Sequence, residues 1–600
     1  MKCAIKLLLV MTVMFYNLNL NAHKTARHKI MTRTAFELLQ KSFPGELTEM
    51  ANYIGDDEED NGDDIMTFGS YKIVSGSWIE DKYDIAYHYG IGETPDLNNV
   101  PPWIEDLFKG KDWFTTITHF WNADGGPDAQ THLSDELYSG GNWVTWSFNC
   151  ENAYQKISHY ANGGFDLRFL YNDTKPLPGY GYLVLGFDWI YQSLVDFYNN
   201  GNYKIVKYLE TWTGNWYAIN SPWFQVNPTE RKQKAYELLG RMCHLVQDMS
   251  VPAHVHNNSH IGKYSMYSDY YEEHEMNYPM PSAESLFDQG ERFINPFNSY
   301  NDPLDYLMYY VNQITDHYAD GENHGDNDFD PSCPGLSRKI STLGEPSLPS
   351  EVNDSNCRNM DNVLYPLAVK ATAGLMYWFA VTTGQLAMPI VASGTINNST
   401  TWEGEVIVTG DVIVANGATL AIEPDTKIYF EDGTKLIVYG TLSSIGTLLN
   451  PILYTTYNET PSPGDWQGIR VIDSGSNTRI RYCEISYAHT AIYGDNSDFN
   501  VQYCYIQDTE YSGINAVNGS VLFLQKNTVV DAHFGLMSRY NASLELSRNY
   551  DWGLNLIMDN YLNLYCTYDA TIELGKTTWM PANNIVKNQR GYYTAVAMFG

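Results

Sequence analysis

The stretch EVIVTGDVIVANGATLAIEPDTKIYFEDGTKLIVYGTLSSIG, residues 405–446, consists of short β-branched runs separated by Gly, Asn and Asp. Each run is four to six residues long, too short for a helix, and each is followed by residues typical of turns. This pattern predicts a succession of short strands joined by tight turns, with no helices between them.

Downstream of this stretch, one sequence unit occurs three times. The copies are RYCEISYAHTAI (481–492), QYCYIQDTEYSGI (502–514) and KNTVVDAHFGL (526–536). Ile492, Ile514 and Leu536 follow at intervals of 22 residues (514 − 492 and 536 − 514). A period in the low twenties without helices is typical of a solenoid. Because stacked coils place equivalent side chains about 4.8 Å apart, we expect Cys483 and Cys504 to form an inward stack. We interpret both as core residues, with a disulfide between coils as the alternative.

The C-terminal half resembles the right-handed parallel β-helix modules of secreted bacterial proteins. The residues that carry this resemblance are 417–442 (GATLAIEPDTKIYFEDGTKLIVYGTL), 450–456 (NPILYTT) and 466–471 (WQGIRV). It implies an all-β right-handed parallel β-helix over residues 401–600, which is either incomplete at Gly600 or capped by the last thirty residues. We interpret this half as a targeting or spacer module that binds a glycan or a cell surface.

Before residue 390 the pattern is helical. Apolar residues recur at helical spacing in three segments, 28–43, 227–249 and 362–384, and Asn227-Pro228-Thr229 is a helix-start signal. We therefore predict a multidomain chain, with an all-α domain over 23–388, a linker over 389–400 and the β-helix over 401–600.

The first 22 residues have the features of a secretory signal: Lys2 and Lys6, a short apolar core, and a cleavage site after Ala22. We therefore expect a secreted or cell-surface protein. The formal charge of −34 argues against a basic groove that follows a nucleic-acid backbone. Two acidic segments, 56–64 (DDEEDNGDD) and 320–330 (DGENHGDNDFD), are interpreted as solvated loops, with calcium binding as the alternative.

The segment HLVQDMSVPAH, residues 244–254, contains two imidazoles and a carboxylate in one turn region. His244 and Asp248 are four residues apart, so a helix places them on one face. Pro252 ends that helix, which lets His254 turn back toward the same point. Thirteen of the 15 histidines precede residue 330, and this bias suggests a metal site in the helical half.

Other segments supply further ligands of the kind that zinc prefers, imidazole nitrogen and carboxylate oxygen. They are AHKTARH (22–28) with His23 and His28, GSWIEDKYD (76–84) with Glu80 and Asp81, and THFWNAD (118–124) with His119. Downstream of His254 lie His256, His260, Glu272 and His274.

Together these segments resemble, in order and spacing, the bacterial zinc-dependent phospholipases C, whose fold is shared with single-strand-specific zinc nucleases. The pattern H-x3-D-x5-H in 244–254 is the central motif. The resemblance implies three Zn²⁺ ions per chain. The first would be held by Asp81 (or Glu80), His119, His244 and Asp248, the second by the amine of His23 with His28 and Asp248, and the third by His254, His260 and Glu272.

The chain departs from the family near the third zinc. Ser268 stands where the family has a histidine, so His260 is taken as the substitute, with His256 and His274 as alternatives. Whichever of Glu80 and Asp81 is not a ligand is assigned as the general base.

The resemblance implies a secreted zinc-dependent phosphodiester hydrolase. We expect a phospholipase C that acts on phospholipids at a membrane surface. The alternatives are a single-strand nuclease of the same fold, which the acidic charge disfavours, and a non-catalytic adhesive or glycan-binding surface protein.

Overall fold

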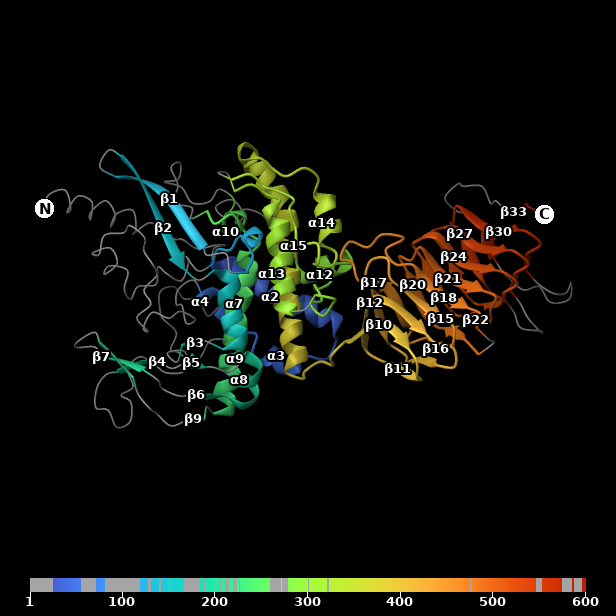
Figure 1. Cartoon of the computed structure of the whole chain (residues 1–600), viewed down its shortest axis with the longest axis horizontal. Coiled ribbons are helices and arrows are strands. Elements are labelled where there is room, and N and C mark those ends of the chain that lie inside the picture. Colours follow the sequence, from blue (N-terminus) through green and yellow to red (C-terminus); the bar gives the residue numbers. More distant parts are fainter. Residues whose placement is uncertain are drawn as a thin grey trace. The chain divides into compact units, whose positions relative to one another are not determined.

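The computed structural model describes residues 25–55, 72–80, 119–127, 131–139, 142–150, 152–163, 165–166, 184–187, 189–190, 193–203, 207–210, 215–218, 224–225, 227–258, 271, 279–300, 302–320, 323–474, 477–546, 553–574, 585–587 and 596–599. These residues form two compact units (Figure 1). One extends to Leu386, and the other comprises 297–299 together with the residues from Ala387 onward.

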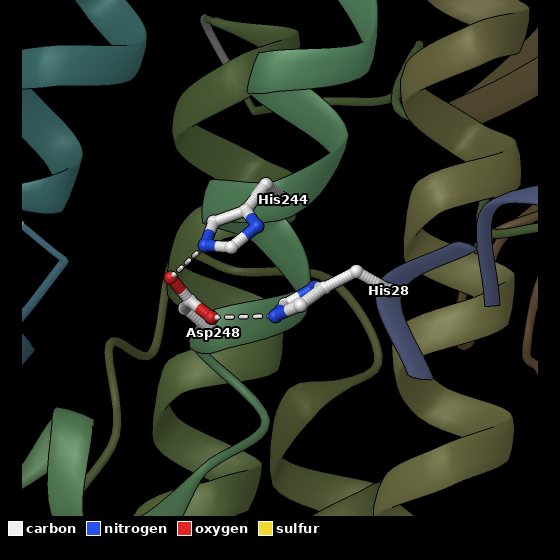
Figure 2. A group of neighbouring side chains, drawn as sticks. All are labelled: His28, His244 and Asp248. Carbon is white, nitrogen blue, oxygen red and sulfur yellow. Dashed lines mark ion pairs between the residues drawn. The ribbon is translucent and has the colours of Figure 1, made fainter. Parts of the chain in front are cut away.

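The first unit is built around three long helices, α2 (Thr25–Ser42), α9 (Pro228–Asp248) and α15 (Asp354–Thr382). Helix α15 packs against both α2 and α9, and α4 (Ile73–Ile79) packs against α2 and α9. As a result, His28 of α2 lies beside His244 and Asp248 of α9 (Figure 2). The other helices among the described residues are α3 (Thr48–Asn52), η2 (Ala123–Gly125), α7 (Ala153–Asn162), α8 (Leu194–Asn200), α10 (Pro252–Val255), α12 (Ala283–Asp288), α13 (Pro303–Asp316), α14 (Leu336–Leu343) and η4 (Pro349–Glu351).

The three helices predicted from periodicity are confirmed. Helix α9 begins as its sequence indicates, because the side chain of Asn227 accepts a hydrogen bond from the backbone N–H of Thr229 at 2.9 Å and Pro228 occupies the first turn. Helix α15 ends before Gly384, whose φ of +77° suits a residue without Cβ. Within α15, the stretch Ser355–Thr382 is long and apolar enough to cross a membrane, but 89% of its most apolar window is buried inside the protein.

The all-α prediction is wrong in one respect. Residues 131–225 contribute short antiparallel strands, which lack the helical spacing of the flanking segments. They are β1 (Thr131–Ser139), β2 (Asn142–Cys150), β3 (Phe165–Asp166), β4 (Val184–Phe187), β5 (Trp189–Ile190), β6 (Asn202–Tyr203), β7 (Lys207–Glu210), β8 (Asn215–Ala218) and β9 (Phe224–Gln225). The unit is therefore mainly helical, with strands on both sides of α7, between η2 and α9.

The second unit is a parallel solenoid with three stacks of strands. Strand β12 (Glu405–Val414) begins two of the stacks, because residues 405–408 pair with β14 and residues 412–414 with β15. One stack continues through β14 (Lys427–Phe430), β17 (Ile452–Thr456), β20 (Cys483–Ser486), β23 (Tyr505–Gln507), β26 (Thr528–Val529), β29 (Leu556–Met558) and β32 (Ile585–Lys587). The next continues through β15 (Lys435–Val438), β18 (Gly468–Ile472), β21 (Thr490–Asp495), β24 (Thr509–Val517), β27 (Ala532–Arg539), β30 (Leu562–Thr567) and β33 (Val596–Phe599).

The third stack is β11 (Thr400–Trp402), β13 (Thr419–Ile422), β16 (Thr441–Ile445), β19 (Arg479–Arg481), β22 (Asp498–Gln502), β25 (Val521–Gln525), β28 (Ser543–Glu545) and β31 (Thr571–Glu573). The expected linker 389–400 instead contains β10 (Ile390–Ile396), which pairs in parallel with β12. Its four β-branched residues suit a strand, so the solenoid begins earlier than predicted.

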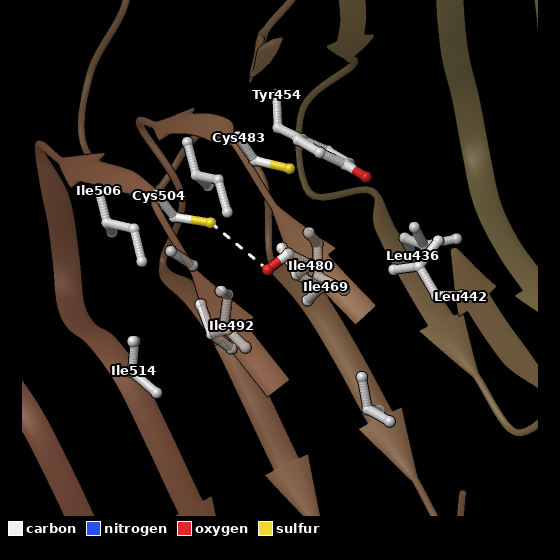
Figure 3. Close-up of a cluster of buried hydrophobic side chains, with 14 of the residues drawn as sticks. Leu436, Leu442, Tyr454, Ile469, Ile480, Cys483, Ile492, Cys504, Ile506 and Ile514 are labelled. Atoms are coloured by element: carbon white, nitrogen blue, oxygen red, sulfur yellow. Dashed lines mark hydrogen bonds between the residues drawn. The ribbon is translucent and has the colours of Figure 1, made fainter. Parts of the chain in front are cut away.

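The 22-residue repeat is confirmed by the register, since Ile492 pairs with Ile514 and Ile514 with Leu536. Cys483 and Cys504 are buried thiols of the solenoid core, as predicted, and they form no disulfide. Figure 3 shows their sulfur atoms directed into the core, where Cys504 Sγ lies 3.7 Å from the carbonyl oxygen of Ile480.

Candidate metal centre

Three fully buried side chains from two helices lie together at the end of α9. They belong to His28, His244 and Asp248, the last residue of that helix. His244 lies one turn earlier, and its Nε2 is 3.0 Å from Asp248 Oδ2. From α2, His28 Nε2 lies 3.5 Å from Asp248 Oδ1 (Figure 2). The rings of His28 and His244 stack with centroids 3.8 Å apart. One ligand atom from each of the three residues lies within 4.8 Å of the others, which is the spacing of a group that can hold one metal ion.

His119 completes the cluster from a different part of the chain. Its Nδ1 is 3.0 Å from Asp248 Oδ2 and 3.2 Å from His244 Nε2. The backbone carbonyl of His119 in turn lies 3.0 Å from His254 Nδ1, and the ring of His254 stacks on Phe120. The segments 118–124 and 244–254 therefore meet at one centre.

Hydrogen bonds to protein oxygens fix which nitrogen of each imidazole carries the proton. Gln247 donates through its amide nitrogen to Thr32 Oγ1 and Thr372 Oγ1, so its Oε1 accepts from His28 Nδ1 at 2.7 Å. The carbonyl oxygen of Ser77 accepts from His244 Nδ1 at 2.5 Å. In the neutral imidazoles Nε2 is therefore the nitrogen with the lone pair, and in both residues Nε2 is directed at Asp248. Such outer contacts are typical of metal-ligating histidines.

Asp248 itself provides the sharpest sign of a cation. Its carboxylate is fully buried, and within the described residues neither of its oxygens accepts a hydrogen bond, although three ring nitrogens are 3.0–3.5 Å away. Burial on its own would raise the pKa of Asp248, and positive charge on the neighbouring His244 and His119 would hold it well below its usual range. When these rings are neutral, a cation is needed to supply that charge. A buried, ionised carboxylate faced by imidazole lone pairs is costly unless a positive charge lies between them.

Two glycines allow the helices to approach closely enough to build this centre. Gly76 of α4 faces Gly240 of α9. A Cβ at Gly240 would lie 2.1 Å from the carbonyl oxygen of Ile73, and one at Gly76 would lie 2.4 Å from that of Glu237. Because no side chain separates the two backbones, the carbonyl of Ser77 reaches His244.

Glu80 lies beside this centre but is already neutralised. Its oxygens contact Lys156 Nζ at 2.6 Å and Arg241 Nη1 at 2.7 Å, and the hydroxyl of Tyr160 donates to both of them. Burial would raise the pKa of Glu80, but Lys156, His119 and Arg241 outweigh it and lower the pKa. Glu80 Oε1 is 3.8 Å from His119 Nε2, beyond hydrogen-bond range, whereas Lys156 Nζ is 3.3 Å from the same nitrogen. Both oxygens of Glu80 are thus engaged by Lys156, Arg241 and Tyr160.

The structure brings together four of the residues expected to hold zinc, His28, His119, His244 and Asp248, and places His254 against the backbone of His119. His256, an alternative for the third zinc, instead contacts Asp316 and Asp320. The other predicted ligands, His23, Asp81, His260, Glu272 and the alternative His274, lie outside the described residues.

Sequence reasoning missed the groups that support the ligands, above all Gln247, Lys156 and Arg241. The sequence contained one signal of these supporting groups. Glu237, Arg241, His244 and Asp248 recur at spacings of four, three and four, which places a polar stripe along a helix whose other residues include many apolar ones. A fully buried polar stripe of this kind requires partners on the neighbouring helices.

Comparisons of the chain with protein-family models, curated proteins and solved structures find no match.

Proposed function

We propose that the helical unit is a secreted zinc-dependent phosphodiester hydrolase of the phospholipase C type. The observation that carries this proposal is the buried carboxylate of Asp248, which accepts no hydrogen bond from the described residues and is faced by the ring nitrogens of His28, His119 and His244. Zinc suits this donor set, because imidazole nitrogen and carboxylate oxygen are its usual protein ligands when thiolates are absent.

The residues that would hold zinc are His28, His119, His244 and Asp248, with Asp248 shared between two ions. The resemblance adds the amine of His23 and Asp81 around the same carboxylate, and His254 with His260 and Glu272 for a third ion. Zinc, when bound, supplies Lewis acidity that activates water and neutralises the charge of a phosphodiester.

The protein's own contribution is to orient the side chains of the ligands for coordination. Gln247 and the carbonyl of Ser77 keep His28 and His244 protonated at Nδ1, so that Nε2 is available for coordination. Glu80 is held between Lys156 and Arg241, and Lys156 Nζ also lies 3.3 Å from Nε2 of His119. Because the low pKa of Glu80 makes it a weak proton acceptor, we give Glu80 no role in proton transfer and keep Asp81 as a zinc ligand.

The charge of the chain favours a lipid over a nucleic acid as the substrate. At −34 the chain repels an extended polyanion, whereas a single phosphodiester group at a membrane surface needs only the local positive charge of the metals. The solenoid would then serve as a spacer or targeting module that attaches the enzyme to a glycan or a cell surface.

The test uses the full-length protein purified from a secreting host. Phosphatidylcholine vesicles and single-stranded DNA are assayed side by side, with Asp248→Asn as the inactive variant and His489→Ala, a partly exposed solenoid residue, as the control. We expect zinc-dependent release of diacylglycerol that is lost in Asp248→Asn and retained in His489→Ala. Cleavage of DNA alone would move the protein to the nuclease alternative, and no hydrolysis of either substrate would favour the adhesive one.

A further inference from the structure

A second cluster of carboxylates lies in the helical unit, apart from the ligands of the proposed zinc centre. It is formed by Asp124 of η2, Asp316 at the end of α13 and Asp326 in the loop after α13. One oxygen from each lies within 4.8 Å of the other two. Three carboxylates at this separation repel one another unless a cation lies between them.

Asp316 carries the strongest indication of a cation site. Its side chain is 6% exposed, and its Oδ2 is a buried atom without a hydrogen-bond partner among the described residues. Its other oxygen, Oδ1, faces His256 Nε2 at 2.8 Å. An unsatisfied buried carboxylate oxygen costs free energy comparable to a lost charged hydrogen bond, so such an oxygen in a native protein calls for a partner.

The local positive charge is too small to balance the cluster. His256 is shared, because its Nδ1 also lies 3.3 Å from Asp320 Oδ2. Asp320 is satisfied separately by hydrogen bonds from Asn258 and Asn323. Burial, and after it the neighbouring Asp316, raise the pKa of both Asp124 and Asp326, the latter to about 6.

The loop that carries Asp326 is held against the end of α13 by its backbone. The N–H of Asp326 donates to the carbonyl of Asp316 at 2.9 Å, and that of Gly325 donates to the carbonyl of Ser347 at 3.0 Å. A Cβ at Gly325 would lie 2.0 Å from the carbonyl oxygen of His317, so only glycine permits this approach. Asp316 and Asp326 are therefore brought together by packed backbone, and the exposed Asp124 joins them from η2.

We propose that Asp124, Asp316 and Asp326 bind a calcium ion that braces the segments carrying His119 and His254. The three donors are all oxygens, which suits a hard cation such as Ca²⁺ and not zinc. Asp124 lies five residues after His119, and Asp316 contacts His256, two residues after His254. The ion would join η2, α10 (through His256) and α13, and this role is independent of whether the zinc centre hydrolyses phosphodiesters.

The experiment measures calcium binding to the full-length protein after chelation and return of zinc alone. Isothermal titration with CaCl₂ and the luminescence of Tb³⁺, sensitised by the nearby Trp121, report on the site. We expect one calcium per cluster and a rise in melting temperature on binding. Asp124→Asn, an exposed position that leaves the fold intact, and Asp326→Asn should each weaken binding on the order of tenfold or more.

Two controls separate this site from other acidic groups and from the zinc centre. Glu351→Gln, an exposed carboxylate at η4, should bind calcium as the wild type does. His244→Ala should lose zinc but keep calcium binding. Absence of calcium-dependent heat and of Tb³⁺ luminescence, equal binding by Asp124→Asn and wild type, or binding of Zn²⁺ in preference to Ca²⁺ at these residues would each overturn the proposal.

Discussion

At the scale of the residue, the centre depends on imidazoles whose Nδ1 atoms are tied to protein oxygens. Gln247 holds His28, and the carbonyl of Ser77 holds His244, so each ring presents Nε2 to Asp248. The backbone carbonyl cannot be removed by substitution, but the Gln247 amide can.

Gln247→Leu removes the acceptor for His28 Nδ1 while keeping much of the volume of the buried side chain. Because outer contacts of this kind usually contribute 10- to 100-fold to metal affinity, we expect zinc binding to weaken by about that factor. A competition titration against a chromogenic chelator measures it. Gln289→Leu, at an exposed glutamine after α12, is the control, and equal zinc affinity in the two variants would contradict the assigned role.

The pH dependence of stability provides a second test at this scale. Burial alone would lower the pKa of His256, but hydrogen bonds and charge from Asp316 and Asp320 raise it to about 10 from an ordinary value of 6.5. A raised pKa in the folded state means that the stabilisation is present below pH 6.5 and is lost as the pH rises toward 10. In calcium-free protein, the unfolding free energy of the wild type should therefore fall over this range more steeply than that of His256→Gln.

Urea denaturation of the two proteins at pH 6.5 and near pH 10 measures this difference. His489→Gln, in the solenoid, should keep the slope of the wild type. A His256→Gln variant with the wild-type slope would show that the ion pairs with Asp316 and Asp320 do not form.

At the scale of the element, the crossing of α4 and α9 sets the geometry of the centre. Gly76 and Gly240 let the two backbones meet, and this contact aligns Ser77 with His244 and Glu80 with Arg241. A side chain at either glycine would push the helices apart and break both contacts.

Gly240→Ala should therefore destabilise the helical unit by about 1–3 kcal/mol, the usual cost of overpacking, and also weaken zinc binding. Thermal unfolding and zinc content of the purified variant measure the two effects. Gly410→Ala is the comparison, because its added Cβ would meet only Ser393 Cβ, at 3.3 Å. Full stability and full zinc content in Gly240→Ala would show that the crossing is not tight.

The sequence predicted the long helices, since α2, α9 and α15 have clear apolar periodicity and caps or stops near their ends. It did not predict β1–β9, because these strands are stabilised by pairing with other strands and their sequences show no clear strand period. The same limit applies to Glu80. Its neutralisation by Lys156 and Arg241 depends on α7 and α9 packing beside α4, which no local pattern reveals.

At the scale of the whole molecule, the sequence changes near residue 390 from helical periodicity to short β-branched runs. This change predicted a helical part followed by a parallel solenoid, and the two compact units bear this out. The repeat spacing of 22 residues was sufficient to predict that Ile492, Ile514 and Leu536 stack on one another. The right-handed coil remains a prediction, supported by the strong preference of parallel crossovers for that hand. The start of the solenoid was missed, because Gly394 within β10 and the flanking Pro389 and Asn397-Asn398-Ser399 make this segment resemble a linker.

The two units should respond differently to metal removal. Metal that binds only the folded state stabilises it by mass action, by about 4 kcal/mol at a thousandfold excess over the dissociation constant. In calorimetry of the full chain, we expect EDTA to lower the transition of the helical unit and leave that of the solenoid unchanged. Asn527→Ala, which removes buried hydrogen bonds to Val501 and Asn555, should lower only the solenoid transition and so identify it. A shift of both transitions by EDTA would contradict metal binding confined to the helical unit.

The most direct test of the central claim is anomalous diffraction at the zinc absorption edge, from crystals of the secreted protein grown without added zinc. The account predicts strong anomalous peaks beside the carboxylate of Asp248, within coordination distance of the imidazoles of His28, His119 and His244. Crystals that diffract well and show Asp248 clearly, but contain no anomalous peak near it, would contradict the assignment of this cluster as a zinc centre.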